Sequence, residues 1–548
     1  MRLTNLFTAV LLFQMTIACH EKQPQKASAS QDVTLSDITV EEQGPSRDVE
    51  TAEMKKIKSV EDKSTSTDST SPNFNTEEYD KIVENEFLSV LQNPLSTFSI
   101  DVDEAAYSNV RRFIQSGQLP PAGAVRIEEM INYFDYEYPQ PQNNDPFSVV
   151  TEISDCPWNE KHRLIHIGLQ GKEIPMDNLP SSNIVFLIDV SGSMNESNKL
   201  PLVQESMKML TDILRAKDKV AIVVYAGSAG LVLPSTSGSD KQKIKSAINN
   251  LEAGGSTAGG EGIQLAYKIA REQFIKEGNN RVILATDGDF NVGISNNDEL
   301  VSLIEKERAS GVFLSILGVG VGNYQDSKMQ QLADKGNGNH SYIDNINEAK
   351  KVLISEFGST LFTIAKDVKL QIEFNPSKVT AYRLIGYENR MLASEDFNDD
   401  KKDAGELGSG HTVTALYEII PAGVKSEFVK TVDPLKYQVA NKTNIVNDGG
   451  NEVMTIKLRY KKPNEDQSSL ISKPVIDTHL SLESTSDNFR FSASVASFGM
   501  LLRNSAYKQN ATLQKTIALA KSARGEDNHG YREEFIELVE SAGNLLKK

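Results

Sequence analysis

The chain has 548 residues, which is enough for three or more domains with separate buried cores. Its net charge of −17 comes from acidic residues spread along the sequence and argues against the phosphate backbone of a nucleic acid as a partner. Two cysteines, Cys19 and Cys156, supply no disulfide framework and say little about the redox compartment.

The first 18 residues are typical of a secretory signal peptide. Arg2 precedes an apolar core from Leu6 to Phe13, and Thr16–Ala18 leads directly into Cys19. This ending resembles the lipobox of bacterial lipoproteins, which implies cleavage before Cys19 and acylation of its thiol. An ordinary signal peptide that leaves Cys19 unmodified is the alternative. No apolar run is long enough to cross a bilayer, so we expect attachment to a membrane through lipid only.

Residues 19–80 are expected to form a disordered tether. The segment is rich in Ser, Thr, Glu, Lys and Gln and poor in large apolar side chains. Such a composition cannot bury enough apolar surface to offset the entropy lost on ordering. A lipid on Cys19 followed by this tether would hold a folded body away from the bilayer.

Folded sequence begins near Tyr79, in a first segment that we bound at residues 81–180. Cys156 and Trp158, in the turn between two predicted strands, are expected to be core residues. Hydrophobic periodicity predicts helices over residues 104–116 and 127–134, and strands over 147–153 and 163–169.

From residue 181 to 362, apolar runs alternate with amphipathic segments, the pattern of a parallel α/β sheet. The run Ile184–Ile188 is uninterrupted, as expected for a strand buried on both faces. Residues 231–233 are predicted to form a short edge strand. Further strands are predicted over 220–225, 281–285, 312–317 and 342–343, and helices over 199–215, 241–251, 263–274, 299–310, 328–334 and 347–362.

Residues 363–548 are expected to form a β-rich domain with a helical tail. Alternating apolar residues predict strands over 368–374, 379–385, 413–419 and 454–460, and the tail from residue 489 onward has helical apolar faces.

The motif with the clearest chemistry begins at Asp189, the residue that ends the run Ile184–Ile188. Asp189, Ser191 and Ser193 put a carboxylate and two hydroxyls on a tight turn at a strand's carboxyl end, where open α/β sheets bind ligands. These hard oxygens suit Mg²⁺, Mn²⁺ or Ca²⁺ better than Zn²⁺. The alternative is that a serine caps the next helix and Asp189 is a solvated turn residue.

Two further turns bring oxygen ligands to the same edge of the predicted sheet. They are Gly255–Thr257 and Thr286–Gly288, each at a position where the sheet delivers a loop. Together with the first turn they can fill most of an octahedral shell and leave one position for the carboxylate of a partner. The candidate metal ligands are Asp189, Ser191, Ser193, Thr257 and Asp287.

These three turns resemble the metal-ion-dependent adhesion site (MIDAS) of von Willebrand factor A domains. DVSGSM at 189–194, GGSTAGGEGI at 254–263 and ATDGDFNVG at 285–293 match its three metal loops in order. The resemblance implies that all five candidate residues are ligands of Mg²⁺, or of Mn²⁺ or Ca²⁺. It also implies a Rossmann-like, doubly wound sheet.

The flanking sequences resemble the YfbK-like family of bacterial A-domain lipoproteins. FSIDVDEAAYSNVRRF from residue 98, VRIEEMINYFDYEYP from residue 125 and AYRLIGYENRMLASEDF from residue 381 are of its type. The resemblance implies an α/β fold class, with the A domain placed between flanking segments. Strands predicted on both sides of it lead to the hypothesis that the two flanks pair into one β-sandwich-like body, with the A domain inserted.

The sequence does not favour an enzyme. It has no G-x-S-x-G elbow, H-E-x-x-H motif or phosphate-binding G-x-x-x-x-G-K loop, and its histidines, His162 and His166 included, show no ligand spacing. A metal-assisted hydrolase would need a general base, and none can be named.

Two other functions remain open. In the first, a lipid-anchored protein of the bacterial cell envelope captures an Asp or Glu of a partner protein through the bound ion, as the resemblance implies, without a small-molecule cofactor. In the second, the A domain is a scaffold or regulatory subunit of an envelope complex, and the metal mainly stabilises loops.

Overall fold

The computed structural model describes residues 75–100, 103–142, 145–226, 228–254, 259–288, 297–356, 362–429 and 450–547. The chain divides into two units, Met1–Thr70 and Ser71–Lys548, and every described residue belongs to the second. Cys19, the expected tether as far as residue 74, and Thr257 lie outside the described residues. Within those residues, no helix is both long and apolar enough to cross a bilayer.

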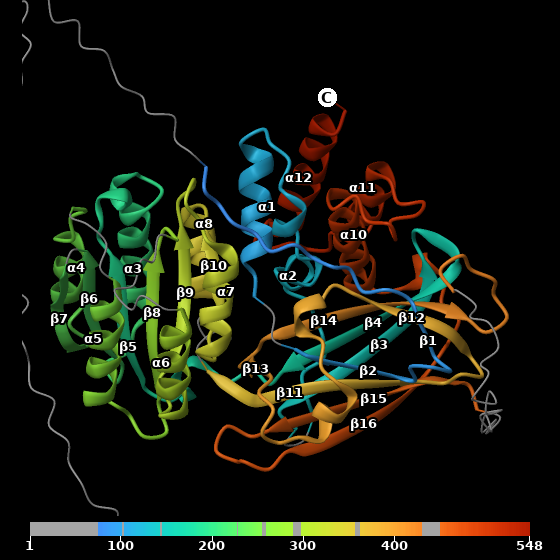
Figure 1. The fold of residues 1–548 in the computed structure, drawn as a ribbon, viewed down its shortest axis with the longest axis horizontal. Helices are drawn as coiled ribbons and strands as arrows, with labels where there is room; N and C mark the ends of the chain where they lie inside the picture. The colour runs from blue at the N-terminus through green and yellow to red at the C-terminus, as the bar shows by residue number, and fades with distance from the viewer. Residues whose placement is uncertain are drawn as a thin grey trace, which may run out of the picture. The chain divides into compact units, whose positions relative to one another are not determined.

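The α/β domain, residues 182–356, is built on a six-stranded sheet in the order β10-β9-β8-β5-β6-β7 (Figure 1). All neighbours pair in parallel except β7, which is antiparallel to β6. Its strands are β5 (Ser182–Asp189), β6 (Lys219–Ala226), β7 (Ser228–Ser237), β8 (Asn279–Thr286), β9 (Phe313–Val319) and β10 (His340–Ile343). Its helices are α3 (Leu200–Ile213), α4 (Lys241–Asn249), α5 (Gly259–Glu272), α6 (Asn297–Ala309), α7 (Asp326–Lys335) and α8 (Ile346–Lys350), which continues into a π-helical turn, η4 (Lys351–Ser355).

Helices cover both faces of this sheet, because β5 is apolar on both sides. Ile184, Phe186 and Ile188 pack into the core formed with α3, α4 and α8. Val185 and Leu187 point the other way, into the core formed with α5, α6 and α7. The uninterrupted apolar run is thereby explained, and the doubly wound sheet is confirmed. The edge strand β7 has ten residues, so the expected three-residue strand was too short.

The segments before and after the α/β domain share two antiparallel sheets. One has the order β1-β12-β14-β4-β3, and the other has the order β13-β11-β15-β16, with β2 also paired to β11. Strands β1 to β4 precede the α/β domain and β11 to β16 follow it, so the hypothesis of one inserted domain is confirmed. The strands are β1 (Leu88–Ser89), β2 (Leu95–Ser99), β3 (Phe147–Cys156), β4 (Asn159–Gly171), β11 (Thr363–Phe374), β12 (Val379–Ile385), β13 (Gly405–Gly408), β14 (Thr412–Pro421), β15 (Glu452–Lys461) and β16 (Ser469–Ile476).

The two shared sheets form a sandwich, and helices cover its outer side. Ile167 of β4 packs inside the sandwich in one cluster with Ile372 and Ile456 of the second sheet. Leu164, on the opposite face of β4, joins a cluster with the helices, which also buries Cys156 and Trp158 as expected. These helices are α1 (Ala105–Gln115), α2 (Ile127–Asn132), α10 (Asp487–Leu502), α11 (Leu513–Lys521) and α12 (Tyr531–Leu545) (Figure 1).

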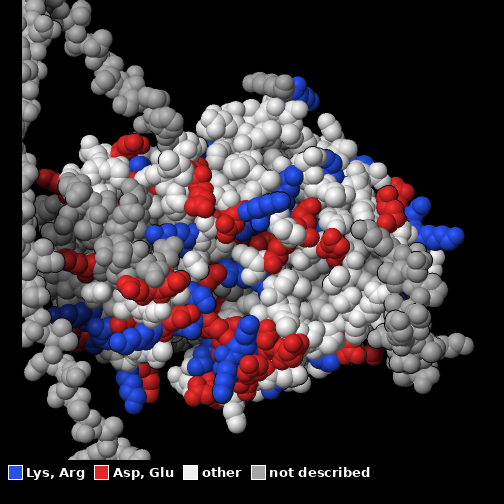
Figure 2. Space-filling view, viewed as in Figure 1, with Lys and Arg blue, Asp and Glu red and all other residues white. Residues whose placement is uncertain are grey.

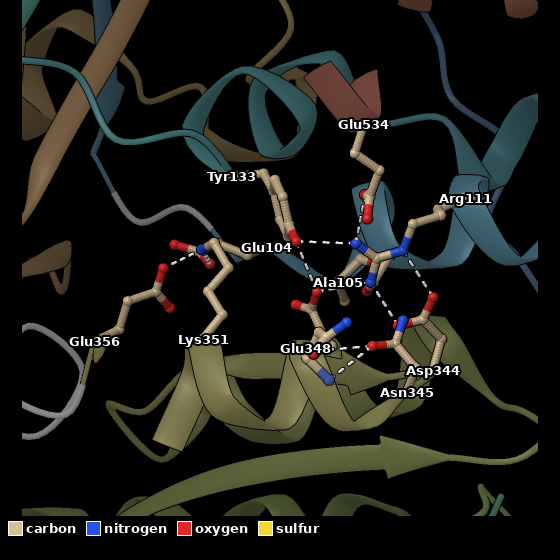
Figure 3. Close-up of polar contacts among 12 residues, drawn as sticks. Glu104, Ala105, Arg111, Tyr133, Asp344, Asn345, Glu348, Lys351, Glu356 and Glu534 are labelled. Carbon is tan, nitrogen blue, oxygen red and sulfur yellow. Dashed lines mark hydrogen bonds and ion pairs between the residues drawn. The ribbon is translucent and has the colours of Figure 1, made fainter. Parts of the chain in front are cut away.

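A buried cluster of charges joins α1, the α/β domain and the helical tail (Figure 3). The guanidinium of Arg111 on α1 lies 2.5 Å from Asp344, 2.7 Å from Glu348 on α8 and 2.9 Å from Glu534 on α12. Beside it, the ammonium of Lys351 pairs with the carboxylates of Glu104 and of Glu356, the residue that follows η4. Breaking a buried pair leaves an uncompensated charge, so these contacts fix the α/β domain to its flanks.

Charges of both signs share the surface. On the face drawn in Figure 2, basic and acidic side chains lie interspersed over the described residues, and the net negative charge is not gathered into a single patch there. A mixed surface of this kind favours solubility and gives a nucleic-acid backbone no continuous basic stripe on this face.

Candidate metal centre

Two carboxylates lie at the carboxyl ends of adjacent parallel strands. β5 pairs in parallel with β8, and Ile188 of β5 stands opposite Ala285 of β8. Asp189 ends β5, and Asp287 follows directly after β8. Both residues are fully buried, at 0% exposure. The sheet register therefore brings together two acids that are 98 residues apart in the sequence, as the motif predicted.

The turn after β5 arranges the two serines beside these acids. The backbone N–H of Ser191 donates to Asp189 Oδ1 over 2.8 Å, and the Ser191 and Ser193 hydroxyl oxygens are 3.1 Å apart. Ser191 precedes a 3₁₀ turn, η3 (Gly192–Asn195), but its side chain makes no capping hydrogen bond. Helix α3 begins only at Leu200, after Lys199. The alternative interpretation, in which a serine caps the helix, is therefore wrong.

Asp189 has an unusual environment for a carboxylate. Burial, and secondarily the nearby charge of Asp287, raise the pKa of Asp189 to about 6. Hydrogen bonds from Ser191 and the Tyr225 hydroxyl lower this pKa but do not cancel the rise. Its Oδ2 atom is buried and has no hydrogen-bond partner of normal geometry among the described residues. A buried carboxylate oxygen left in this way is costly, and a cation would satisfy it.

Asp287 is compensated by a buried lysine. Burial alone would raise the pKa of Asp287, but the Lys199 charge and hydrogen bonds from Ser193, Lys199 and Asn323 hold it below its usual value. Lys199 Nζ lies 3.0 Å from Asp287 Oδ2. The hydrogen bond from Ser193 also links the two turns, so four of the five candidate ligands lie together.

The loop between β9 and α7 supports this arrangement. Gly288 follows Asp287 with a φ of +102°, and a Cβ there would lie 2.7 Å from the Asn323 carbonyl oxygen and 2.7 Å from the Gln325 nitrogen. Only glycine accepts both the backbone conformation and the close approach. Gly288 thus allows the loop to reach Asp287 through Asn323.

The fifth candidate ligand, Thr257, lies outside the described residues, but the chain on both sides of it is well placed. The Gly254 N–H donates to the Val190 carbonyl over 2.7 Å, next to Asp189. Helix α5 begins at Gly259 and packs closely on the sheet, because a Cβ at Gly262 would lie 2.8 Å from Tyr225 Cβ.

Lys199 is the residue at this site that the sequence did not reveal. It precedes α3, where the motif gives no reason to single out a lysine, and its side chain is only 4% exposed. No spacing rule connects it to Asp287, which is 88 residues further along the chain. The sheet and the β9–α7 loop bring the two together.

The donor set fits a hard divalent cation. Two carboxylates and two hydroxyls meet, and Ser193 is exposed and thus open to an incoming ligand. Among the described residues, no group of three or more His, Cys, Asp or Glu is arranged to hold a metal. His162 and His166 make separate contacts, to Glu418 and to Tyr138 respectively, and form no joint site.

Family comparisons agree with this geometry. The family model "von Willebrand factor type A domain" matches residues 183–353, a domain type that commonly binds a divalent ion at a MIDAS. The model "Uncharacterized protein YfbK, C-terminal" matches 359–545, and a third model, "von Willebrand factor", matches 73–166.

The chain is 46% identical to the uncharacterized protein YfbK of Escherichia coli K12 over 480 residues, covering 86% of this chain and 82% of that protein. It is 28% identical over 189 residues to the uncharacterized protein sll0103 of Synechocystis, covering 34% of this chain and 43% of that protein.

Two solved structures resemble about a third of the chain. BatB from Bacteroides thetaiotaomicron is 24% identical with a TM-score of 0.28, and the match covers 32% of this chain and 97% of that one. Proximal thread matrix protein 1 of the mussel byssus, with a zinc-occupied MIDAS motif, is 26% identical with a TM-score of 0.27, and the match covers 32% of this chain and 45% of that one.

Proposed function

Because this chain belongs to the YfbK family, whose members carry a von Willebrand factor A domain, we propose that it is a lipid-anchored protein of the bacterial cell envelope that captures a partner protein through a divalent cation. The A domain is the α/β domain described above. We place its boundaries at residues 181 and 362, between an N-terminal region, 81–180, and a C-terminal domain, 363–548. The anchor is a lipid on Cys19, exposed by removal of residues 1–18. The tether expected over residues 19–80 is proposed only as far as residue 74, because Thr76 and Glu78 hydrogen-bond to the β9–α7 loop and Glu77 pairs with Arg112.

The proposed ion is Mg²⁺, with Mn²⁺ or Ca²⁺ as alternatives of the same hard-oxygen chemistry. The observation that carries the proposal is the pairing of buried Asp189 and Asp287 beside the hydroxyls of Ser191 and Ser193. A bound ion supplies an electrophilic centre for a carboxylate of the partner. The residues of this chain hold and orient it, and the proposed ligands are Asp189, Ser191, Ser193, Thr257 and Asp287.

Binding is favoured over catalysis because the described residues offer no base beside the two acids that would hold the ion. The basic side chain described beside Asp287 is that of Lys199, and its ammonium is already hydrogen-bonded to Asp287. A hydrolase would need a free base within hydrogen-bond reach of an attacking water.

Capture experiments test this function. The full chain, wild type or Asp189→Ala, would be immobilised and exposed to envelope extract with Mg²⁺ or with EDTA. We expect one set of partners that is retained by wild type in Mg²⁺ and lost both in EDTA and with Asp189→Ala. Asp212→Ala is the matched control, because Asp212 is a surface residue of α3 whose side chain is 61% exposed. Partners that bind equally in all four conditions would contradict metal-mediated capture.

One observation favours a second function, that of a scaffold in which the ion only stabilises loops. The A domain is fixed to its flanks by buried ion pairs, such as that of Arg111 with Asp344, so the whole second unit could present a single rigid surface. Under this function, EDTA lowers the melting temperature and leaves the partners bound.

Anchoring is tested separately from capture. Replacement of Cys19 by Ser should move the protein from the membrane fraction to the soluble fraction and abolish incorporation of labelled fatty acid. Cys156→Ser is the matched control, because Cys156 is buried in the folded body. Continued membrane attachment of Cys19→Ser would contradict the lipid anchor.

A further inference from the structure

Lys199 places a positive charge inside the proposed metal centre. Its side chain is 4% exposed, and its ammonium lies 3.0 Å from Oδ2 of Asp287, which is 0% exposed. Most buried lysines form such a pair for stability. Here the pair also lies where the divalent ion of the proposed metal centre would bind. A charge this close to a ligand oxygen, away from water, interacts strongly with a divalent ion held by the same carboxylate.

The lysine cannot easily turn away when an ion arrives. Its aliphatic stem runs over Gly320, where a Cβ would collide with Lys199 Cε and lie 2.7 Å from Cγ. Gly320 has a φ of +77° and begins the β9–α7 loop, so the stem fills a groove that only a glycine leaves open. Moving the ammonium to solvent would give up this packing of the stem against the loop.

The charges at the site can be counted. Asp189 and Asp287 bring two negative charges and Lys199 brings one positive charge, so the site of described residues carries −1 without an ion. A divalent cation changes this to +1. Without Lys199, the same ion would leave the site neutral overall, and only the open position on the ion itself would attract an acid.

We propose that Lys199 shares Asp287 with the bound ion, which weakens ion binding and leaves the loaded site with a positive charge that the carboxylate of a partner neutralises. This inference rests on the proposed function and deepens it. The ion and the partner then bind cooperatively. The ion gives the site a net positive charge, and the carboxylate of the partner neutralises it. In the ion-free protein, the same lysine holds together the two acids that would otherwise repel each other.

A purely structural role makes a different prediction. If Lys199 served only to hold Asp287 in the correct orientation, its loss would weaken ion binding. Two variants separate the possibilities. Lys199→Met keeps the stem and removes both charge and hydrogen bond, whereas Lys199→Gln removes the charge and keeps a hydrogen-bond donor for Asp287.

The experiment is a calorimetric titration of the full chain with Mn²⁺ alone, in chloride and in acetate at equal ionic strength. Lys199→Gln and Lys199→Met should each bind Mn²⁺ at least about ten-fold more tightly than wild type in chloride. Acetate should tighten Mn²⁺ binding in wild type and have less effect in both variants. The matched control is Lys208→Met, which removes a partly exposed lysine of α3, paired with Glu205.

The melting temperature in EDTA gives a second readout. It should fall in both Lys199 variants, since the acids lose their counter-charge, while Mn²⁺ affinity rises. Unchanged or weaker Mn²⁺ binding in both variants, with normal binding in wild type, would overturn this inference and leave the proposed function standing. If neither wild type nor the variants bind Mn²⁺, both fail together. Asp189→Ala, which should abolish the isotherm in each background, shows that this site is being measured.

Discussion

Arg126 and Asp326 form a buried ion pair with two hydrogen bonds, 2.5 Å from Nη1 to Oδ2 and 3.0 Å from Nη2 to Oδ1. Arg126 lies in the segment before the A domain, and Asp326 begins α7 within it. Their side chains are 6% and 0% exposed. Burial alone would raise the pKa of Asp326, but the Arg126 charge holds it below its usual value. The pair is therefore a charged link between two parts of the chain that are 200 residues apart.

Asp326→Asn should destabilise the full chain by about 3 to 5 kcal/mol, because it leaves the Arg126 guanidinium buried without its main counter-charge. Urea unfolding monitored by circular dichroism measures the change. Lys208→Met, which breaks a pair with a mostly exposed glutamate, should cost less than about 1 kcal/mol. A cost for Asp326→Asn as small as that of the control would show that the link contributes little.

Removal of the ion should destabilise the wild-type protein through mass action. At a concentration about 100 times the dissociation constant, an ion that binds only the folded state adds about 2.7 kcal/mol of stability. The melting temperature of wild type should therefore rise with Mg²⁺ or Mn²⁺ and fall in EDTA. Asp189→Asn should show no ion-dependent shift, and should melt above wild type in EDTA, since one of two buried carboxylates is gone. An equal ion-dependent shift in this variant would place the ion elsewhere.

Gly288→Ala should impair both stability and ion binding. The substitution forces a φ of +102° on a residue with a side chain and sets its Cβ 2.7 Å from two backbone atoms of the β9–α7 loop. Backbone strain alone costs about 1 to 2 kcal/mol, and the clash must displace either Asp287 or the loop. Gly117→Ala is the control, because Gly117 has a φ of +78° and a Cβ added there would meet nothing within 4 Å. Mn²⁺ titration should show weaker binding for Gly288→Ala alone.

Glu128 should make stability depend on pH. Burial, and then the charge of Glu388, raise its pKa from 4.5 to about 7. A carboxyl group with a raised pKa in the folded state contributes full stability below pH 4.5 and loses it as the pH rises through about 7. Glu128→Gln should therefore be more stable than wild type at pH 8, by on the order of 3 kcal/mol, with a smaller difference at pH 5. Chemical denaturation at both pH values measures this. A difference that is the same at both would show that Glu128 does not titrate as described.

Local patterns predicted most of the central sheet. The run Ile184–Ile188 indicated a strand buried on both faces, and the residues after it defined the candidate site, because strand order in a parallel sheet places successive loops at one edge. The strand β16 was missed. It includes Lys473 and Pro474 and is exposed at alternate positions, so its apolar pattern is too weak to distinguish from a loop.

Contacts between distant segments could not be predicted from periodicity. Lys199 meets Asp287 only because the β9–α7 loop and α3 pack together, and Arg126 meets Asp326 only after the A domain has docked on its flanks. Such pairs depend on tertiary distances, which a one-dimensional pattern does not contain. The alternation of apolar residues gave the strands of the flanks, while the pairing of β4 with β14 needed the three-dimensional structure.

The shared sheets have a consequence for biosynthesis. Strand β4 pairs along its length with β14, where Leu169 stands opposite Val413, and β14 is made only after the entire A domain has left the ribosome. Until then, β4 can hydrogen-bond only to β3, and its other edge is open to aggregation. The A domain has local connections and can fold first, so it would bring the two halves of the sandwich within reach of each other. Truncation soon after residue 362 should therefore yield a soluble A domain attached to an unfinished, chaperone-dependent sandwich.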